Sequence, residues 1–432
     1  MSETNESTSG LSRRKLIGAA GIGALAVGAG AGGGYAVGRQ GDEPTAGVPD
    51  PDAQPIPFEG VHQAGIVTPA QDRLYFVTLD MTSEERADLI SLLKDWTDAS
   101  RQMTQGNDVG KFGAVSGSPF APPEDTGEAL GLPPSGLTIT VGFGRSLFVD
   151  AKGKPRFGLD GKLPDKLKEL PAFSGDQLDP AISDGDLAIQ ACANDPQVAV
   201  HAVRNLVRIA FGRASVRYSQ MGFGRTSSTS SAQVTARNML GFKDGTANIK
   251  VEDKKDVEDF VWVSEEDGPD WLVGGSYLVS RKINMRIEIW DREPLEGQEN
   301  IIGRAKGSGG PLSGGDEFAT IDFKKKNDRG APVIDMKSHV RLAHPDFNHG
   351  AKLLRRGYNF VDGSDGLGQL SAGLFFIAYQ RDPEKQFVQV QRSLAGSQND
   401  LLNEYIVHVS SGLFACPPGV GRKGFWGERL FD

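Results

Sequence analysis

The order of strand-like and helix-like segments is the feature that most constrains the fold of this chain. Two segments carry apolar residues at helical spacing: Ser83–Thr104, with Ser83 as its N-cap, and Pro196–Phe211. Short apolar runs before and between them predict strands at Ala64–Leu79, Leu137–Val141, Ser146–Val149 and Leu187–Ala193. This order predicts an antiparallel sheet with helices on one side, which is an α+β fold.

The rest of the chain has a similar order. It predicts strands at Val216–Phe223, Gly275–Ile289, Gly373–Tyr379 and Gly412–Cys416, and helices at Pro383–Ala395 and Leu401–Val407. The tetrapeptide Gly-Phe-Gly-Arg occurs at 142–145 and again at 222–225, which indicates a duplication. Because the order resembles a ferredoxin-like unit, we predict two ferredoxin-like halves, 58–215 and 216–432.

Length and charge limit the classes of function. The chain has 432 residues and a formal net charge of −9. This length predicts two or three domains, or one large duplicated domain, with room for a buried cofactor. A net acidic surface argues against nucleic acid as a partner, because phosphate binding needs clustered Lys and Arg.

The first 40 residues predict a targeting segment. Arg13 and Arg14 precede an Ala/Gly-rich, weakly hydrophobic run from Gly18 to Gly38. This order resembles a twin-arginine export signal, so we expect the twin-arginine machinery to export the chain to the periplasm or the exterior. An uncleaved membrane anchor is the alternative. The Pro-, Gly- and Asp-rich residues 41–57 predict a linker.

The two cysteines leave two redox states open. Cys192 and Cys416 both lie in apolar runs, which favours buried free thiols. In an oxidising compartment a disulfide is the alternative. Neither spacing makes a Cys-x-x-Cys motif.

A glycine-flanked carboxylate is the first candidate for chemistry. Gly241–Gly245 reads Gly-Phe-Lys-Asp-Gly, which places Asp244 on a turn where the backbone can approach a flat ligand closely. A carboxylate held there could transfer a proton to or from a small bound molecule. An Asp-Gly hairpin turn without chemistry is the alternative.

Three of the six histidines lie in one later segment. His339, His344 and His349 follow each other at steps of five, which does not bring side chains together on a helix or on one face of a strand. Pro345 also interrupts any helix there. One histidine acting alone is therefore favoured over a metal-binding triad, and a single axial histidine is what a haem iron needs.

Several motifs together resemble the dye-decolourising peroxidases, in particular their exported, deferrochelatase/peroxidase-like bacterial branch. Gly-Phe-Lys-Asp-Gly matches the GxxDG signature, Ser-His-Val-Arg-Leu-Ala the proximal segment, and Leu-Arg-Arg-Gly-Tyr the distal arginine segment. The opening strand from Phe58 to Ile66 is also similar. This resemblance implies two ferredoxin-like halves that form a barrel-like unit with peripheral helices. It also implies haem b, held mainly by the second half.

The resemblance implies roles for individual residues. His339 is the expected axial ligand of the haem iron, and Asp244 and Arg355 are the expected catalytic pair on the opposite haem face. Arg356 is the competitor of Arg355. Asn248 is expected to line the cofactor pocket.

The expected ligand also needs a carboxylate partner. A metal-bound histidine usually donates its other N–H to such a group. Asp400 and Glu404 are the candidates, and Glu404 matches the family segment better.

The resemblance implies a haem peroxidase that reduces hydrogen peroxide and oxidises bulky organic reductants, such as dyes or phenols, through a ferryl intermediate. The alternative is an exported haem-binding protein that serves iron acquisition. The presence of both Asp244 and Arg355 favours the enzyme. The sequence leaves open the physiological reductant and whether the chain forms a homo-oligomer.

Overall fold

The computed structural model describes residues 54–396 and 400–432. The expected export signal at 1–40, and linker residues 41–53, lie outside these residues. Within the described part, no helix is both long enough and apolar enough to cross a membrane.

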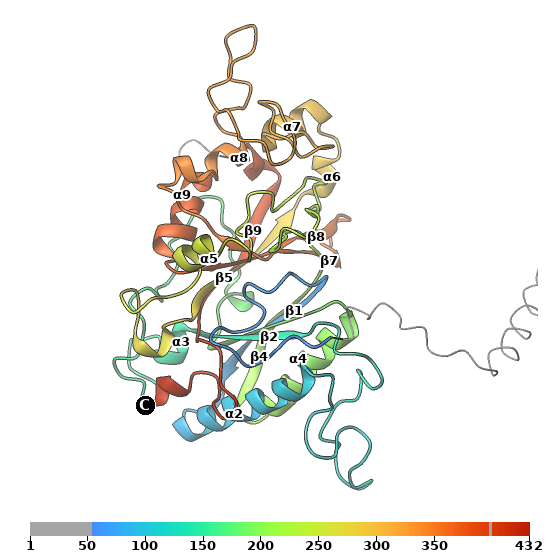
Figure 1. Ribbon diagram of the computed structural model, residues 1–432, viewed down its shortest axis with the longest axis vertical. Coiled ribbons are helices and arrows are strands. Elements are labelled where there is room, and N and C mark those ends of the chain that lie inside the picture. The colour runs from blue at the N-terminus through green and yellow to red at the C-terminus, as the bar shows by residue number, and fades with distance from the viewer. Residues whose placement is uncertain (1–53, 397–399) are drawn as a thin grey trace, which may run out of the picture. The chain divides into compact units, whose positions relative to one another are not determined.

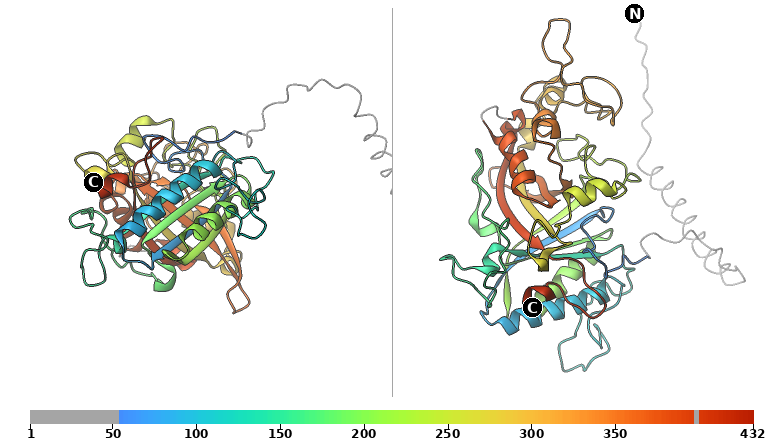
Figure 2. Two further views of the ribbon diagram at one scale, coloured as in Figure 1. Left: turned by 90° about the horizontal axis from the view of Figure 1, so that it is seen from below. Right: turned by 60° about the vertical axis from the view of Figure 1, so that its left-hand side comes forward.

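The first half of the described chain is a ferredoxin-like unit (Figure 1). Its strands pair antiparallel in the order β2-β3-β1-β4. Helices α2 and α4 lie side by side across one face of this sheet, as the left view of Figure 2 shows. Its elements are β1 Arg73–Met81, α2 Arg86–Met103, β2 Thr138–Gly144, α3 Arg145–Phe148, β3 Leu187–Ala193, α4 Pro196–Ala210 and β4 Ala214–Arg225.

The second half repeats the topology. Its strands pair antiparallel in the order β9-β5-β8-β7, and the two-residue strand β6 adds to β8. Among the described residues, three α-helices lie between β5 and β6, and one α-helix lies between β8 and β9. The elements are α5 Lys254–Phe260, β5 Ser276–Met285, α6 Ile287–Trp290, α7 Leu295–Ile302, α8 His339–Leu342, β6 Leu354–Arg355, β7 Tyr358–Ser364, β8 Leu370–Gln380, α9 Gln389–Ala395 and β9 Ile406–Cys416.

Short irregular helices complete the fold. A π-helix at Glu384–Val388 leads directly into α9. Single turns of 3-10 helix occur at Pro180–Ile182, Asp270–Leu272, Pro345–Phe347, Leu401–Glu404 and Glu428–Phe431.

The two sheets join at both edges. Strand β2 pairs with β9 through Phe143 and Gly144, and β4 pairs with β7 through Phe223 and Arg225. Strand β5 pairs with β8 as well as with β9. The strands therefore pair in a closed order, β5-β9-β2-β3-β1-β4-β7-β8 and back to β5. The expected α+β architecture of two ferredoxin-like halves, arranged in a barrel-like way, is confirmed.

Successive side chains of a strand point to opposite faces of the sheet, so neighbouring residues of one strand belong to different hydrophobic cores. On β9, Phe414 and Cys416 join a core that both sheets share, whereas Leu413 and Ala415 join the core that includes residues of α2 and α4. A third core includes Trp290 of α6 together with residues of α7 and β8. Both cysteines are free and buried, which is the state that their apolar sequence surroundings favour.

The structure corrects several element predictions. The strand expected from Ala64 starts only at Arg73, and the segment Ser146–Val149 is mostly the short helix α3. The helix expected at Leu401–Val407 is a 3-10 turn, followed by strand β9 from Ile406. Apolar runs this short fit a strand and a buried helix equally well, so the pattern alone could not decide.

Two boundaries also differ from the prediction. Helix α2 begins at Arg86 with Glu85 as its N-cap, whereas the Ser83 hydroxyl accepts from the Glu85 N–H and donates to Asp88. Strand β4 pairs with β1 from Ala214 to Phe223 and so completes the first sheet. The first half therefore extends to Arg225 rather than ending at 215.

Candidate active site

Asp244 lies at the end of a short hairpin. Arg237 and Lys243 form an isolated antiparallel bridge, and the Asp244 N–H donates to the Ala236 carbonyl at 3.0 Å. Gly245 follows with φ +111°, and a Cβ there would lie 2.9 Å from the Ser227 Cα. Only glycine fits this close approach, which explains the second glycine of the motif.

Arg355 lies opposite this hairpin, on the two-residue strand β6. Its backbone pairs with Ala378 of β8, and its Nη1 donates to the Asp244 Oδ1 at 2.5 Å. The Asp244 side chain is 15 % exposed and that of Arg355 27 %. The structure therefore brings the two predicted residues together as an ion pair that keeps some accessible surface.

Asn248 connects the two segments that carry this pair. Its Oδ1 accepts from the Arg355 N–H at 2.7 Å, and its Nδ2 donates to the Arg355 carbonyl at 2.8 Å. A third bond joins Nδ2 to the Ser228 carbonyl at 3.1 Å. The amide thus pairs with the Arg355 backbone much as a neighbouring strand would. Asn248 is 6 % exposed, and these contacts hold Arg355 in place.

His339 begins helix α8. Its Nδ1 lies 2.6 Å from the Asp400 Oδ2. An ionised carboxylate can only accept, so in the neutral imidazole Nδ1 carries the proton and Nε2 keeps its lone pair. Burial by itself lowers the pKa of His339, but the charge and hydrogen bond of Asp400 outweigh it and raise that pKa above its ordinary value.

Asp400, and not Glu404, is the carboxylate that contacts His339. Asp400 is the N-cap of the turn Leu401–Glu404: its Oδ1 accepts from the Leu402 N–H at 2.9 Å while its Oδ2 faces the histidine. Glu404 lies at the other end of this turn and is exposed. The preference for Glu404 is therefore wrong, because the tight turn separates the two carboxylates.

The Asp–Arg pair lies within electrostatic range of His339. The charge of Asp244 acts to raise the pKa of His339, and that of Arg355 acts to lower it. The His339 side chain is 37 % exposed, although burial is the largest influence on its pKa. The histidine is thus surrounded by protein but keeps an accessible ring.

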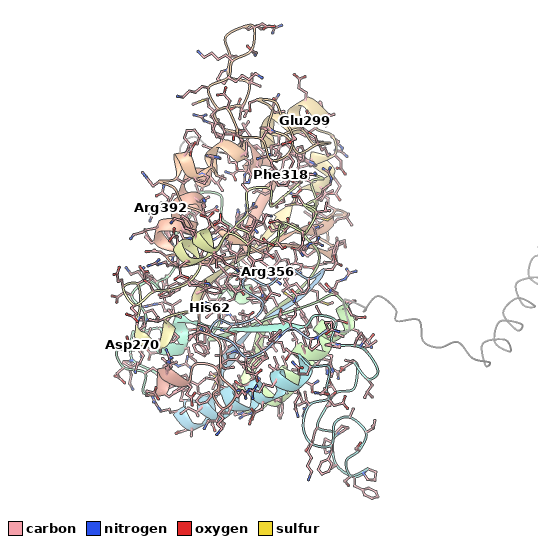
Figure 3. The ribbon with its side chains drawn as sticks, viewed as in Figure 1. His62, Asp270, Glu299, Phe318, Arg356 and Arg392 are labelled. Carbon is pink, nitrogen blue, oxygen red and sulfur yellow. The ribbon has the colours of Figure 1, made fainter. Side chains whose placement is uncertain are left out.

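Arg356 has a separate environment. It is fully buried and donates to the Thr68 carbonyl and to the Gln71 Oε1. Figure 3 shows it near the centre of the view, at the level of the sheets. Tyr358, two residues further on, donates to the Cys192 Sγ at 3.4 Å. Of the two adjacent arginines, only Arg355 therefore contacts Asp244.

The donor set fits a haem better than a metal ion held by side chains alone. Among the described residues, no group of three or more His, Cys, Asp or Glu side chains could hold a metal ion. His339 offers one imidazole nitrogen that makes no hydrogen bond to any described residue, and its tautomer is fixed by Asp400. One such nitrogen is what an axial position requires, since the porphyrin supplies the other ligands.

Comparison with known proteins gives the family. The family described as "Dyp-type peroxidase, N-terminal" matches residues 63–224, and "Dyp-type peroxidase, C-terminal" matches residues 235–421. The chain belongs to the Dyp-type peroxidases. It is therefore a haem-dependent peroxidase with haem b as its cofactor, hydrogen peroxide as its oxidant and an organic reductant.

Individual relatives agree with this family. A protein named deferrochelatase from Escherichia coli K12 is 38 % identical over 427 residues, which are 97 % of this chain and 96 % of the relative. The solved structure of an oxyferrous/water mixed complex of DtpA from Streptomyces lividans has 38 % identity and a TM-score of 0.79, and covers 88 % of this chain and 98 % of that one. A DyP-type peroxidase from Cellulomonas bogoriensis has 37 % identity and a TM-score of 0.78, with 89 % and 99 % covered.

One residue near the site was missed by sequence reasoning. The Glu317 carboxylate binds the side chains of both Lys243 and Thr246, which lie on either side of Asp244. Thr246 and Glu317 are 71 positions apart in the sequence, so no local pattern could have indicated this contact.

Proposed function

We propose that His339 binds the haem iron through Nε2 and that Asp244 and Arg355 act on hydrogen peroxide at the other haem face. Haem, when bound, supplies the redox-active iron at which the O–O bond is cleaved. The observation that carries this proposal is the ion pair between Asp244 and Arg355 within electrostatic range of a histidine with one free nitrogen.

The two residues have different tasks: Asp244 transfers a proton, and Arg355 stabilises negative charge. The Asp244 carboxylate would accept a proton from the inner peroxide oxygen, which is the one on the haem side, and return it to the outer oxygen, which leaves as water. The two electrons for this cleavage would come from a bound haem, which would also take up the remaining oxygen. Arg355 donates N–H bonds to the outer oxygen while negative charge develops on it. Because Arg355 already donates to Asp244, its guanidinium is held beside the carboxylate that transfers the proton.

Two further parts of the proposal concern location and substrate. Arg13 and Arg14 support export by the twin-arginine route, which moves folded proteins and so suits a chain that receives its cofactor first. We also propose that the reductant is bulky, as a dye or a phenol is.

Stopped-flow mixing of the haem-loaded protein with peroxide tests the catalytic pair. Arg355→Ala or Asp244→Ala should slow the spectral change by at least about tenfold, since positioned proton transfer typically contributes about 10²–10⁴-fold. We expect Arg355→Ala to have the larger effect, because a water chain can replace a carboxylate more easily than a fixed cation. Arg356→Lys is no control, since Arg356 is buried; the exposed Arg329→Lys is suitable. Parent rates in both alanine variants would refute the assignment.

Removal of iron from haem is a second candidate, because several relatives carry the name deferrochelatase. The same site would bind the haem. Iron release by the parent without any peroxide-dependent spectral change would favour this function over the first.

A further inference from the structure

We infer that Glu317 is a positioning residue for the reaction with peroxide, and that it holds the hairpin that carries Asp244. Glu317 lies in the long segment between α7 and α8, far from the catalytic motif in sequence. Figure 1 shows this segment as loops beside the two helices. The inference rests on the proposed role of Asp244.

The Glu317 carboxylate binds residues on both sides of Asp244. On the far side of Asp244, the Thr246 hydroxyl donates to Oε1 at 3.1 Å; on the near side, the Lys243 ammonium donates to Oε2. The side chain of Thr235, which precedes the hairpin, also acts to lower the pKa of this carboxylate. One carboxylate therefore fixes the position of the turn relative to the segment between α7 and α8.

Glu317 is itself held in place. Its side chain is 11 % exposed, and the Arg304 Nη1 donates to the Glu317 carbonyl at 2.9 Å and to the Gly309 carbonyl at 2.7 Å. Gly309 has φ +80°, and a Cβ there would lie 2.7 Å from the Lys243 Cδ. The loop thus packs directly on the lysine that Glu317 binds. Figure 3 places Phe318, the next residue, in the upper part of the view below Glu299 of α7.

The pKa of Glu317 agrees with a carboxylate that stays charged while it binds Lys243 and Thr246. Burial acts to raise the pKa of Glu317, but hydrogen bonds from Lys243, Thr235 and Thr246 lower it overall. The carboxylate therefore stays ionised at working pH and keeps its contacts. None of its contacts is with Asp244 or Arg355, so it acts through the backbone of the hairpin.

The test uses haem-loaded full-length protein and stopped-flow mixing with peroxide. Glu317→Ala should slow the reaction by about tenfold, a part of what a positioned proton-transfer group supplies. The absorption spectrum and haem content should stay those of the parent. Asp316→Asn is the matched control at the adjacent, exposed carboxylate, and it should react at the parent rate.

A double variant distinguishes positioning from general damage. In the Asp244→Ala background, Glu317→Ala should slow the reaction with peroxide by less than about twofold, because the carboxylate that Glu317 positions is already gone. The association rate of cyanide, which also loses a proton as it binds ferric haem, should fall in Glu317→Ala in parallel with the peroxide rate.

Each outcome has one meaning. A parent rate in Glu317→Ala, or an equal loss in both backgrounds, overturns the inference while leaving Asp244 in its role. If Asp244→Ala itself reacts at the parent rate, the proposed function of that residue fails, and the role of Glu317 fails with it. Should Glu317→Ala not retain haem, Glu317→Gln decides: its neutral amide should still slow the reaction by about two- to threefold, and a parent rate overturns the inference.

Discussion

At the scale of single residues, Asp400 shows how one carboxylate serves two neighbours. Its Oδ1 caps the turn Leu401–Glu404, and its Oδ2 accepts from His339. The cap fixes the carboxylate, and the fixed carboxylate orients the imidazole. With the residue 2 % exposed, solvent competes little for either bond.

Replacement of this carboxylate should weaken haem binding. Asp400→Asn removes the charge that favours proton donation from the His339 Nδ1, so the ring becomes a poorer ligand. We expect haem affinity to fall by about 10- to 100-fold, the usual cost of losing such a partner, and the reduction potential to rise. Titration of the haem-free protein with haem measures this. Glu404→Gln is the matched control, and an equal loss in that variant would contradict the assignment.

The sequence indicated candidates for the site, but not all of their contacts. Motif order pointed to Asp244, Arg355 and His339 as candidates, and the structure brings these three into one region. It was not sufficient to choose between Asp400 and Glu404, because the choice depends on a tight turn. Contacts of Glu317 could not be predicted at all, because they join segments that are distant in sequence.

At the scale of elements, side chains that alternate between the two faces of a strand explain why one face of a sheet packs in the shared core and the other packs against helices. The strand Leu187–Ala193 agrees with its prediction, because all seven residues are buried and the apolar run has clear ends. Predictions failed where a short apolar run met a turn, as at Arg145 and Leu401. There, tertiary contacts decide the conformation.

The pairing of β5 with β9 predicts a pH dependence of stability. The Arg281 Nε donates to the His408 Nδ1 at 3.1 Å, and Arg281 also pairs with Asp176. Burial, aided by the charge of Arg281, lowers the pKa of His408 to about 3. Below its ordinary pKa of about 6.5, the unfolded chain binds a proton that the folded chain does not, so folding free energy is lost as pH falls.

His408→Gln should remove much of this loss. Between pH 6 and pH 4, His408 lowers the free energy of unfolding by on the order of 1 kcal/mol per pH unit. Glutamine keeps an acceptor for Arg281 but does not titrate. Denaturant unfolding at several pH values measures the slope. The exposed His349→Asn variant should keep the parent slope. An unchanged slope in His408→Gln would show that other groups cause the acid sensitivity.

At the scale of the whole described chain, two similar halves share one core and join by two short strand pairings. The duplication was predictable from the order of elements. The repeated tetrapeptide did not contribute, because both of its copies, at 142–145 and 222–225, lie in the first half. The edge pairings were not, because they depend on how the two sheets approach each other. The site lies in the second half, as expected from the positions of the motifs.

Export is the prediction that concerns the chain as a whole. Replacing Arg13 and Arg14 by lysine should leave the precursor inside the cell, because the twin-arginine receptor recognises the guanidinium groups. Arg39→Lys, outside the pair, should be exported normally. Cell fractionation with immunodetection measures both. Normal export of the double-lysine variant would assign the chain to another route.

The central claim is that one histidine holds the haem, and the haem content of His339→Ala tests it most directly. The Soret absorption of this variant, expressed with adequate iron, should be lost or greatly reduced, because the single axial nitrogen is gone. His344→Ala, five residues away in the same segment, should keep the parent spectrum. A full, unchanged Soret band in His339→Ala would contradict the account, and loss of the band in His344→Ala would assign the ligand to that residue instead.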